Sequence, residues 1–143
     1  DYGSMNEAHQ RYRHFLETLT AERLDRLSEI VDADVRLVDP INDVRGADEM
    51  ARVFQHLFDN VSDVQFSVRH MSSDGPTCLM DWHFKGHLRG TKWAFDGASV
   101  IQFGKDGRVR SHVDYWDAAQ NFYERMPFIG WLLAAVRRQI AIR

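Results

Sequence analysis

Residues 93–116 read WAFDGASVIQFGKDGRVRSHVDYW, and this stretch decides the fold class. Its first part alternates aromatic or aliphatic residues with small or polar ones, which is the period of a strand with one buried face. Lys105-Asp106-Gly107 then has the composition of a tight hairpin. A second alternating run follows from about Arg108 to Trp116. The stretch therefore predicts two long antiparallel strands joined by a short turn.

Two further strands are expected upstream, on either side of the turn residues Ser73-Asp74-Gly75-Pro76. Because successive side chains of a strand point to opposite faces, alternate residues should share a face. The shared faces that we expect are Val64, Phe66, Val68 and His70 on one strand, and Cys78, Met80, Trp82 and Phe84 on the next.

The first third of the chain is typical of helices. Apolar residues recur at helical spacing from Glu7 to Leu19, again after Thr20, and a third time from about Ala47 to Asp59. A short strand from Val35 to Asp39 separates the second and third helices, and Pro40 ends it. Helices followed by antiparallel strands predict an α+β fold. We expect a strongly curved sheet that wraps the three helices into a cone with an apolar concave face.

The C-terminal segment from Ala118 to Arg143 is predicted to form two short helices, divided by Pro127 and Gly130. Its apolar run, Phe128 to Val136, is followed by basic residues at the end of the chain. We favour a helix that closes the open end of the cone or packs on a partner subunit. Docking on a membrane surface is the less favoured alternative.

Composition bounds the class of protein. With 143 residues and 44% hydrophobic residues, the chain can bury one core, so we expect a single domain over residues 5–143 and a leader or tag remnant at 1–4. A net charge of −3 argues against nucleic acid as a partner. The single Cys78 excludes a disulfide framework. Neither an 18-residue apolar run nor a signal peptide is evident, so a cytoplasmic location is expected. No metal or cofactor is expected.

The chain resembles the nuclear-transport-factor-2-like superfamily, which includes ketosteroid isomerases and SnoaL-like polyketide cyclases. The features that carry the resemblance lie between Glu7 and Asp117. They are Gln10-Arg11-Tyr12 with Phe15-Leu16, Val38-Asp39-Pro40, Arg45-Gly46, and the hairpin Val100-Ile101-Gln102-Phe103 with Asp106-Gly107-Arg108-Val109. The resemblance implies the cone fold, a hydrophobic pocket without a cofactor, and pairing of two copies through the outer face of the sheet.

The resemblance also implies site residues. Asp39 matches the proton-shuttling aspartate of the isomerases, with a turn residue as the alternative interpretation. At their oxyanion-hole positions this chain has Phe15, with Tyr12 one turn earlier, and Ser99. Since these positions lack the isomerase donors, steroid isomerase chemistry is not expected.

The polyketide cyclases place an aspartate on a late strand near a histidine, and residues 112–116, HVDYW, resemble that arrangement. Alternation puts His112, Asp114 and Trp116 on one face, and the question left open is whether that face is the inner one. His70 is a further candidate acid or base, with a satisfied core or rim histidine as the alternative. Phe54, Phe58 and Trp82 are expected to line the pocket or the core.

Two functions are compatible with these residues. The first is an enzyme that binds a small hydrophobic molecule and moves a proton with Asp39 or Asp114, assisted by His70 or His112, as an isomerase, lyase or cyclase. The second is a non-catalytic module that binds a ligand or a protein. Converging ionisable groups inside the cone would favour the enzyme.

Overall fold

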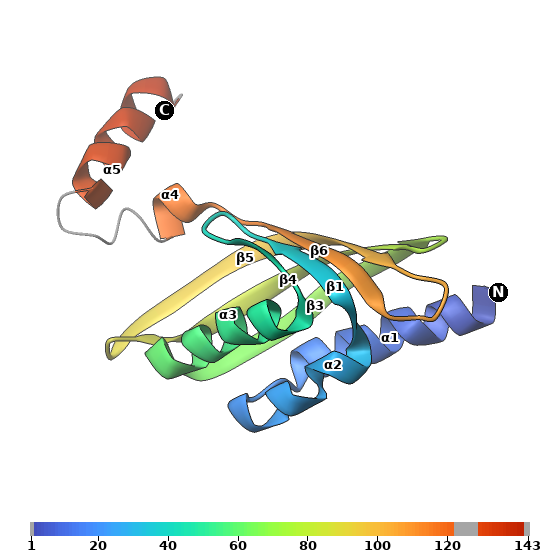
Figure 1. The fold of residues 1–143 in the computed structure, drawn as a ribbon. Coiled ribbons are helices and arrows are strands. Elements are labelled where there is room, and N and C mark those ends of the chain that lie inside the picture. Colours follow the sequence, from blue (N-terminus) through green and yellow to red (C-terminus); the bar gives the residue numbers. More distant parts are fainter. Residues whose placement is uncertain (1, 122–128, 142–143) are drawn as a thin grey trace.

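The computed structural model describes residues 2–121 and 129–141. Five helices, a 3-10 turn and six strands follow one another along the described chain (Figure 1). Their bounds are α1 Tyr2–Glu17, η1 Ala21–Arg26, α2 Leu27–Ile30, β1 Val31–Val38, β2 Asp43–Arg45, α3 Ala47–Asn60, β3 Val61–Asp74, β4 Thr77–Leu88, β5 Thr91–Phe103, β6 Val109–Tyr115, α4 Ala118–Asn121 and α5 Ile129–Ile140.

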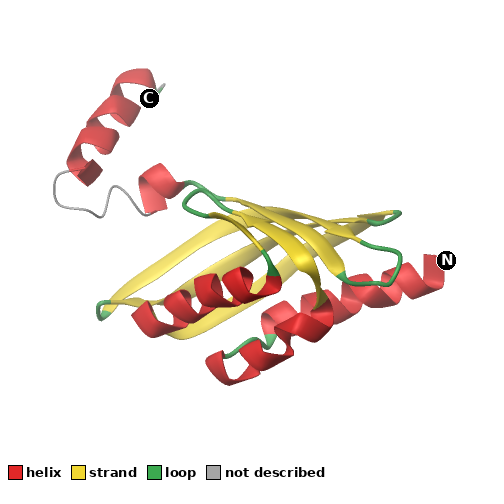
Figure 2. Ribbon diagram, viewed as in Figure 1, coloured by secondary structure: helices red, strands yellow, loops and turns green. Residues whose placement is uncertain are grey.

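The six strands form one sheet in the order β2-β1-β6-β5-β4-β3. Neighbouring strands are antiparallel, except that β1 runs parallel to β6. The sheet curves around helices α1 to α3, which lie together on its concave face (Figure 2). The predicted α+β cone is therefore confirmed. The parallel pair and the short strand β2 are details that the alternation did not reveal.

Local sequence explains where the helices begin and end. Gly46 adopts a φ of 106° at the N-cap of α3, a conformation that glycine accepts at little cost. Asp48 and Glu49 then lie in the first turn, where negative charge favours a helix N-terminus. Thr20 caps η1 without a side-chain hydrogen bond, and the predicted second helix is shorter than expected because Val31 already belongs to β1.

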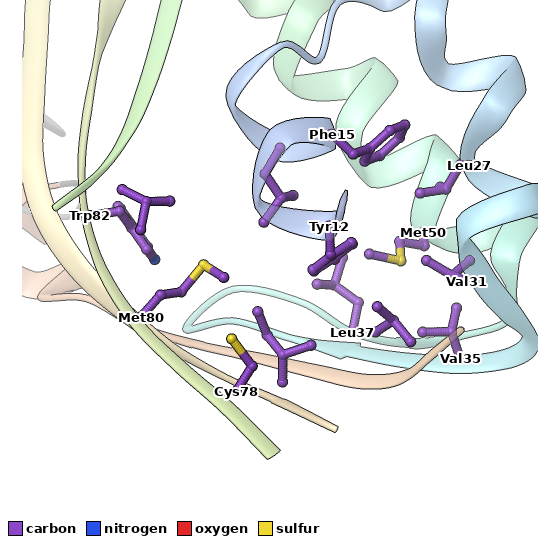
Figure 3. Close-up of a cluster of buried hydrophobic side chains, with 14 of the residues drawn as sticks. Tyr12, Phe15, Leu27, Val31, Val35, Leu37, Met50, Cys78, Met80 and Trp82 are labelled. Atoms are coloured by element: carbon purple, nitrogen blue, oxygen red, sulfur yellow. The ribbon is translucent and has the colours of Figure 1, made fainter. Parts of the chain in front are cut away.

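The core lies between the helices and the concave face of the sheet. Cys78, Met80 and Trp82 on β4 point from the sheet towards Tyr12 and Phe15 on α1 (Figure 3). This is the inner face that the alternation of β4 predicts. Leu27, Val31, Val35, Leu37 and Met50 close the other end of the same cluster and are all nearly inaccessible to solvent.

Among the register irregularities of the sheet, two β-bulges decide which of the candidate site residues face inwards. On β3, Val68 pairs with Trp82 but His70 pairs with Asp81, so Arg69 is an extra residue. On β6, Val109 pairs with Phe103 but Ser111 pairs with Gln102, so Arg110 is extra. A bulge shifts the alternation by one residue and moves all later side chains to the other face.

The C-terminal helices follow β6 at one end of the sheet. The indole N–H of Trp93 donates a hydrogen bond to the backbone carbonyl of Asn121, which ties α4 to β5. Helix α5 packs against α4 and stands apart from the sheet and from helices α1 to α3 (Figure 1). Within residues 2–121 and 129–141, no helix combines the length and apolar character needed to cross a membrane. The cytoplasmic location and the bounds of the domain stay predictions.

Candidate active site

A pocket opens between α1, α3 and the sheet. Its walls are largely apolar, and two carboxylates and one imidazole face into it. The lining residues are Leu16, Glu17, Leu19, Phe54, Leu57, Phe58, Val64, Phe66, Phe84, His112 and Asp114. The cavity measures about 80 Å³. That is well below the roughly 300–1,000 Å³ of most ligand sites, so it fits a small molecule unless the walls move.

The bulge at Arg110 brings His112 and Asp114 to the inner face. The bulge falls between Val109 and His112, which are three residues apart. Regular alternation would put these two side chains on opposite faces, but with the bulge both are buried on the inner face. His112 is 4% exposed and Asp114 is 22% exposed. The sequence left the inner face of β6 open, and the structure assigns it to His112 and Asp114.

Asp114 belongs to a chain of five hydrogen-bonded side chains. Its Oδ1 atom lies 2.5 Å from Ser99 Oγ and 2.6 Å from His112 Nε2. Behind His112, the Nδ1 atom lies 2.7 Å from the Tyr12 hydroxyl. Behind Ser99, Oγ lies 2.8 Å from Trp82 Nε1. The chain crosses from α1 through β6 and β5 to β4, so the fold itself assembles it.

One set of donor directions satisfies every group in this chain. Trp82 Nε1–H can only donate, so Ser99 accepts from it and donates its own hydroxyl proton to Asp114. Burial raises the pKa of Tyr12 well above its usual range, with smaller contributions from Asp114 and Cys78, so this phenol keeps its proton. Tyr12 then donates to His112 Nδ1, and His112 donates from Nε2 to Asp114.

In this arrangement Asp114 accepts both hydrogen bonds, and His112 accepts at Nδ1 and donates from Nε2. Both protein donors converge on Oδ1. Within the part of the chain that the structure describes, Oδ2 has no hydrogen-bond partner, and Asp114 lines the pocket. One carboxylate oxygen is thus held in place while the other is available to a ligand.

Gly97 makes room for Trp82, the last side chain of the hydrogen-bonded series that begins at Tyr12. It lies opposite Trp82 in the β4–β5 pairing. A Cβ atom at position 97 would lie 2.3 Å from Cη2 and 2.5 Å from Cζ2 of the indole. The absence of a side chain therefore lets the indole lie across β5 and reach Ser99.

Glu17 is the second carboxylate of the pocket, but its oxygens already have protein partners. Its Oε2 accepts a hydrogen bond from the backbone N–H of Val68 at 2.9 Å, and Oε1 lies 3.5 Å from Arg13 Nε. Arg13 also donates to the carbonyl of Val68 at 3.1 Å. Together these side chains of α1 hold the β3 backbone beside its bulge, so Glu17 has a structural role. No pattern in the sequence had pointed to this role.

Asp39 does not line the pocket. Its Oδ1 accepts hydrogen bonds from the backbone N–H groups of Ile41 and Asn42, at 2.7 and 2.6 Å. The Asn42 amide also donates to Oδ2 at 3.1 Å. The carboxylate closes the turn between β1 and β2, as the alternative interpretation of Asp-Pro proposed. The resemblance to the isomerases holds for the position of Asp39 in the sequence, and its surroundings here are those of a turn residue.

His70 was expected on the inner face with Val64, Phe66 and Val68, and this is wrong. The bulge at Arg69 turns His70 outwards, where its side chain is 83% exposed and lies 2.9 Å from Asp81. The same outer face carries the pair His83–Asp96, and the hydrogen bond from His83 lowers the pKa of Asp96. This charged face is the surface proposed for pairing of two copies, which stays a prediction.

The remaining predicted residues fall into three groups. Phe54 and Phe58 line the pocket from α3, where both side chains are half-buried. Phe15 lies in the core, stacked on Tyr12 with a ring separation of 6.4 Å. Trp116 packs on Phe95 at 4.8 Å, in an aromatic cluster outside the pocket lining. The aromatic residues of the sequence thus serve the core more than the pocket.

Most of the apolar residues that line the pocket were predicted to face inwards, but the sequence did not assign them to a pocket. Leu16 and Leu57 belong to helical stripes, and Val64, Phe66 and Phe84 belong to strand faces, so each was recognised as inward-facing. Nothing in the sequence separates residues that line a cavity from residues that fill a core. Only the spacing between α1, α3 and β3 decides that difference.

The match to a family model decides the classification. The model of the SnoaL-like domain matches residues 12–112, which is well over half of the chain. The chain belongs to the SnoaL-like domain family. The match begins at Tyr12 and ends at His112, two members of the hydrogen-bonded chain, and Asp114 lies just beyond it. No curated protein matches the sequence.

Solved structures confirm the nuclear-transport-factor-2-like fold of this SnoaL-like domain. An LEH-like epoxide hydrolase from M. tuberculosis superposes with a TM-score of 0.70 at 17% identity, covering 96% of both chains. A putative SnoaL-like polyketide cyclase from Jannaschia sp. gives 0.69 at 16% identity, covering 99% of this chain and 94% of the other. Another, from Mesorhizobium loti, gives 0.65 at 14% identity, covering 78% and 97%. At such identities the likeness extends to the fold alone.

Proposed function

We propose that this SnoaL-like domain binds a small hydrophobic molecule in the pocket and transfers a proton with Asp114 as the general base. The observation that carries the proposal is the Asp114 carboxylate, which lines an apolar pocket with Oδ1 held by two donors and Oδ2 left for a ligand. The reaction class would be that of an isomerase, lyase or cyclase that needs no cofactor.

The hydrogen-bonded chain explains how Asp114 would work. The Asp114 carboxylate lies against Leu, Val and Phe side chains, so a bound apolar molecule would meet this base within a largely apolar wall. Oδ2 removes a proton from a carbon acid of the bound molecule, and the neutral carboxyl group can return that proton at a second position. Ser99 and His112 keep the carboxyl plane fixed during both transfers, so little reorganisation is required.

The pocket also limits the substrate. Phe54, Phe58, Phe66 and Phe84 contribute aromatic rings, which favour a flat apolar molecule. Among the residues that line it, none is Lys or Arg. An anionic ligand would therefore be repelled by Asp114, which has no Lys or Arg partner among the described residues, and a neutral molecule suits the site better.

The alternative is a module that binds the same kind of molecule without chemistry. The small cavity agrees with it, but the convergence of Asp114 and His112 within 2.6 Å in a mostly buried site favours the enzyme. A module that only binds an apolar ligand does not need a carboxylate in its pocket, and burying a charge in such a pocket costs free energy.

A general probe of a carboxylate base can test the proposal without knowledge of the substrate. A nitro-substituted benzisoxazole opens when a base removes its ring C–H proton. The electron pair forms the nitrile, the N–O bond breaks, and a coloured phenoxide is released. We expect the wild-type chain to accelerate this reaction, and Asp114→Asn to lower kcat/KM by about a hundredfold or more. Formation of the phenoxide is followed by absorbance.

A matched variant controls for the loss of a carboxylate outside the pocket. Asp39→Asn removes a turn carboxylate that does not line the pocket, so its activity should stay near that of the wild type if the protein remains folded. Circular dichroism and thermal unfolding would establish folding for each variant. Equal activity of wild type and Asp114→Asn would eliminate Asp114 as the base. Tight binding of the probe without any acceleration would favour the binding module.

A further inference from the structure

Helix α5 presents its aliphatic side chains to solvent. Leu132, Val136 and Ile140 follow one another at intervals of four residues, which places them along one side of the helix. They are 49%, 50% and 79% exposed, and Trp131 is 63% exposed. The partly covered positions are Ala134, Ala135 and Arg137 instead. A helix that packs on its own domain would bury the aliphatic side, so this orientation is the reverse of a core helix.

The charged residues at the C-terminal end of the sequence are all basic. Residues 125–143 contain four arginines and no acidic residue, although the whole chain has a net charge of −3. Arg138 is exposed on α5, roughly opposite the aliphatic side chains, with Arg137 beside it. An apolar side and an opposite cationic side are together the features of a helix that lies in the interface of an anionic lipid bilayer.

We propose that α5 docks this domain on anionic lipid membranes, lying in the plane of the interface. With 12 residues the helix is about 18 Å long, which is too short to cross the roughly 30 Å hydrocarbon layer. Leu132, Val136 and Ile140 enter the boundary between head groups and acyl chains. Arg138, on the opposite side of the helix, faces the lipid phosphates. This inference is independent of the proton-transfer proposal, since no residue of α5 lines the pocket.

A second copy of the chain is a less suitable occupant of this helix. Two α5 helices packed through their aliphatic sides would bring their arginines together without an acidic residue on either helix to offset them. One helix of about 18 Å also offers less than the roughly 800 Å² per partner of a stable interface. A lipid surface meets both demands, because it provides negative charge and an extended apolar layer.

Co-sedimentation of the full chain with vesicles tests the proposal. One set of vesicles is pure phosphatidylcholine, and the other is an equimolar mixture of phosphatidylcholine and phosphatidylglycerol. We expect binding to the mixed vesicles, weakening as salt is added, and little binding to the neutral ones. The double variant Leu132→Asp with Val136→Asp, and separately Arg138→Glu, should each reduce partitioning, the former by about tenfold or more.

Matched substitutions outside α5 test whether the loss of vesicle binding is specific to this helix. Leu79→Asp changes an exposed aliphatic residue of the outer sheet face, and Arg26→Glu reverses an exposed charge on η1. Both should bind vesicles like the wild type. Absence of binding to anionic vesicles, or binding unaffected by the α5 variants, would overturn the proposal. Size-exclusion chromatography with light scattering completes the test, since a dimer abolished by the double variant would show that α5 binds a second copy instead.

Discussion

Replacement of Gly97 by alanine should disturb the hydrogen-bonded chain from a position that touches neither Asp114 nor a ligand. The added Cβ would lie 2.3, 2.5 and 2.9 Å from three carbons of the six-membered ring of Trp82. All three distances are shorter than carbon atoms tolerate, so the indole must tilt away. Since its N–H reaches Ser99 at 2.8 Å, any tilt lengthens that hydrogen bond and releases the Ser99 hydroxyl.

The cost follows from packing. Trp82 is 4% exposed and lies among Phe66, Phe95 and Met80, so its ring has little free space to move into. Overpacking of this kind costs about 1–3 kcal/mol, and a weakened buried hydrogen bond adds about 1 kcal/mol. A total of about 2–4 kcal/mol should lower Tm by roughly 6–16 °C in a domain of this size.

A double-mutant cycle gives the decisive measurement. Trp82→Phe removes the benzo ring that the new Cβ would strike, so Gly97→Ala in that background should cost nothing, or should stabilise by up to about 1 kcal/mol. Urea unfolding of the wild type, both single variants and the double variant gives a coupling energy, which we expect to be about 2–3 kcal/mol. Additive effects would refute the claim that Gly97 exists to accommodate Trp82.

Two further predictions concern α1. His9 is fully buried, with Nδ1 2.6 Å from Ser73 Oγ and with Nε2 unpaired among the described residues, and burial lowers its pKa. Its contribution to stability is therefore complete above its unfolded pKa of about 6.5 and is lost as pH falls below that value. Urea unfolding from pH 7.5 to 5.5 should show a loss that is smaller in His9→Phe. Tyr12→Phe leaves His112 Nδ1 without its donor and should cost about 1–3 kcal/mol, measured by urea unfolding, whereas Tyr115→Phe on the exposed face should cost almost nothing.

The inner faces of β4 and β5 could be predicted from alternation because these two strands pair without interruption from Thr77 to Leu88. Cys78, Met80 and Trp82 face the core as expected. The same reasoning failed for His70, which follows a bulge on β3. A bulge depends on the partner strand and on side chains from elsewhere, here Arg13 and Glu17, so periodicity along one strand cannot reveal it.

The positions of the ionisable residues in the pocket were likewise predictable only in part from the sequence. That His112 and Asp114 share a face follows from their spacing alone, because any strand places residues i and i+2 on the same side. That this face is the inner one was decided by the bulge at Arg110. The contacts of Asp114 with Ser99, and of His112 with Tyr12 one hundred residues away, needed the packed sheet and α1.

By itself, the sequence determined the α+β class, the helical and strand segments, and the chemistry available at each position. Those properties depend on local periodicity and on residue type. The tertiary structure decided which carboxylate serves the pocket and which closes a turn, because Asp114 and Asp39 differ only in what surrounds them. It also decided that the aliphatic side of α5 faces solvent, since no pattern within a helix tells which side of it the rest of the chain covers.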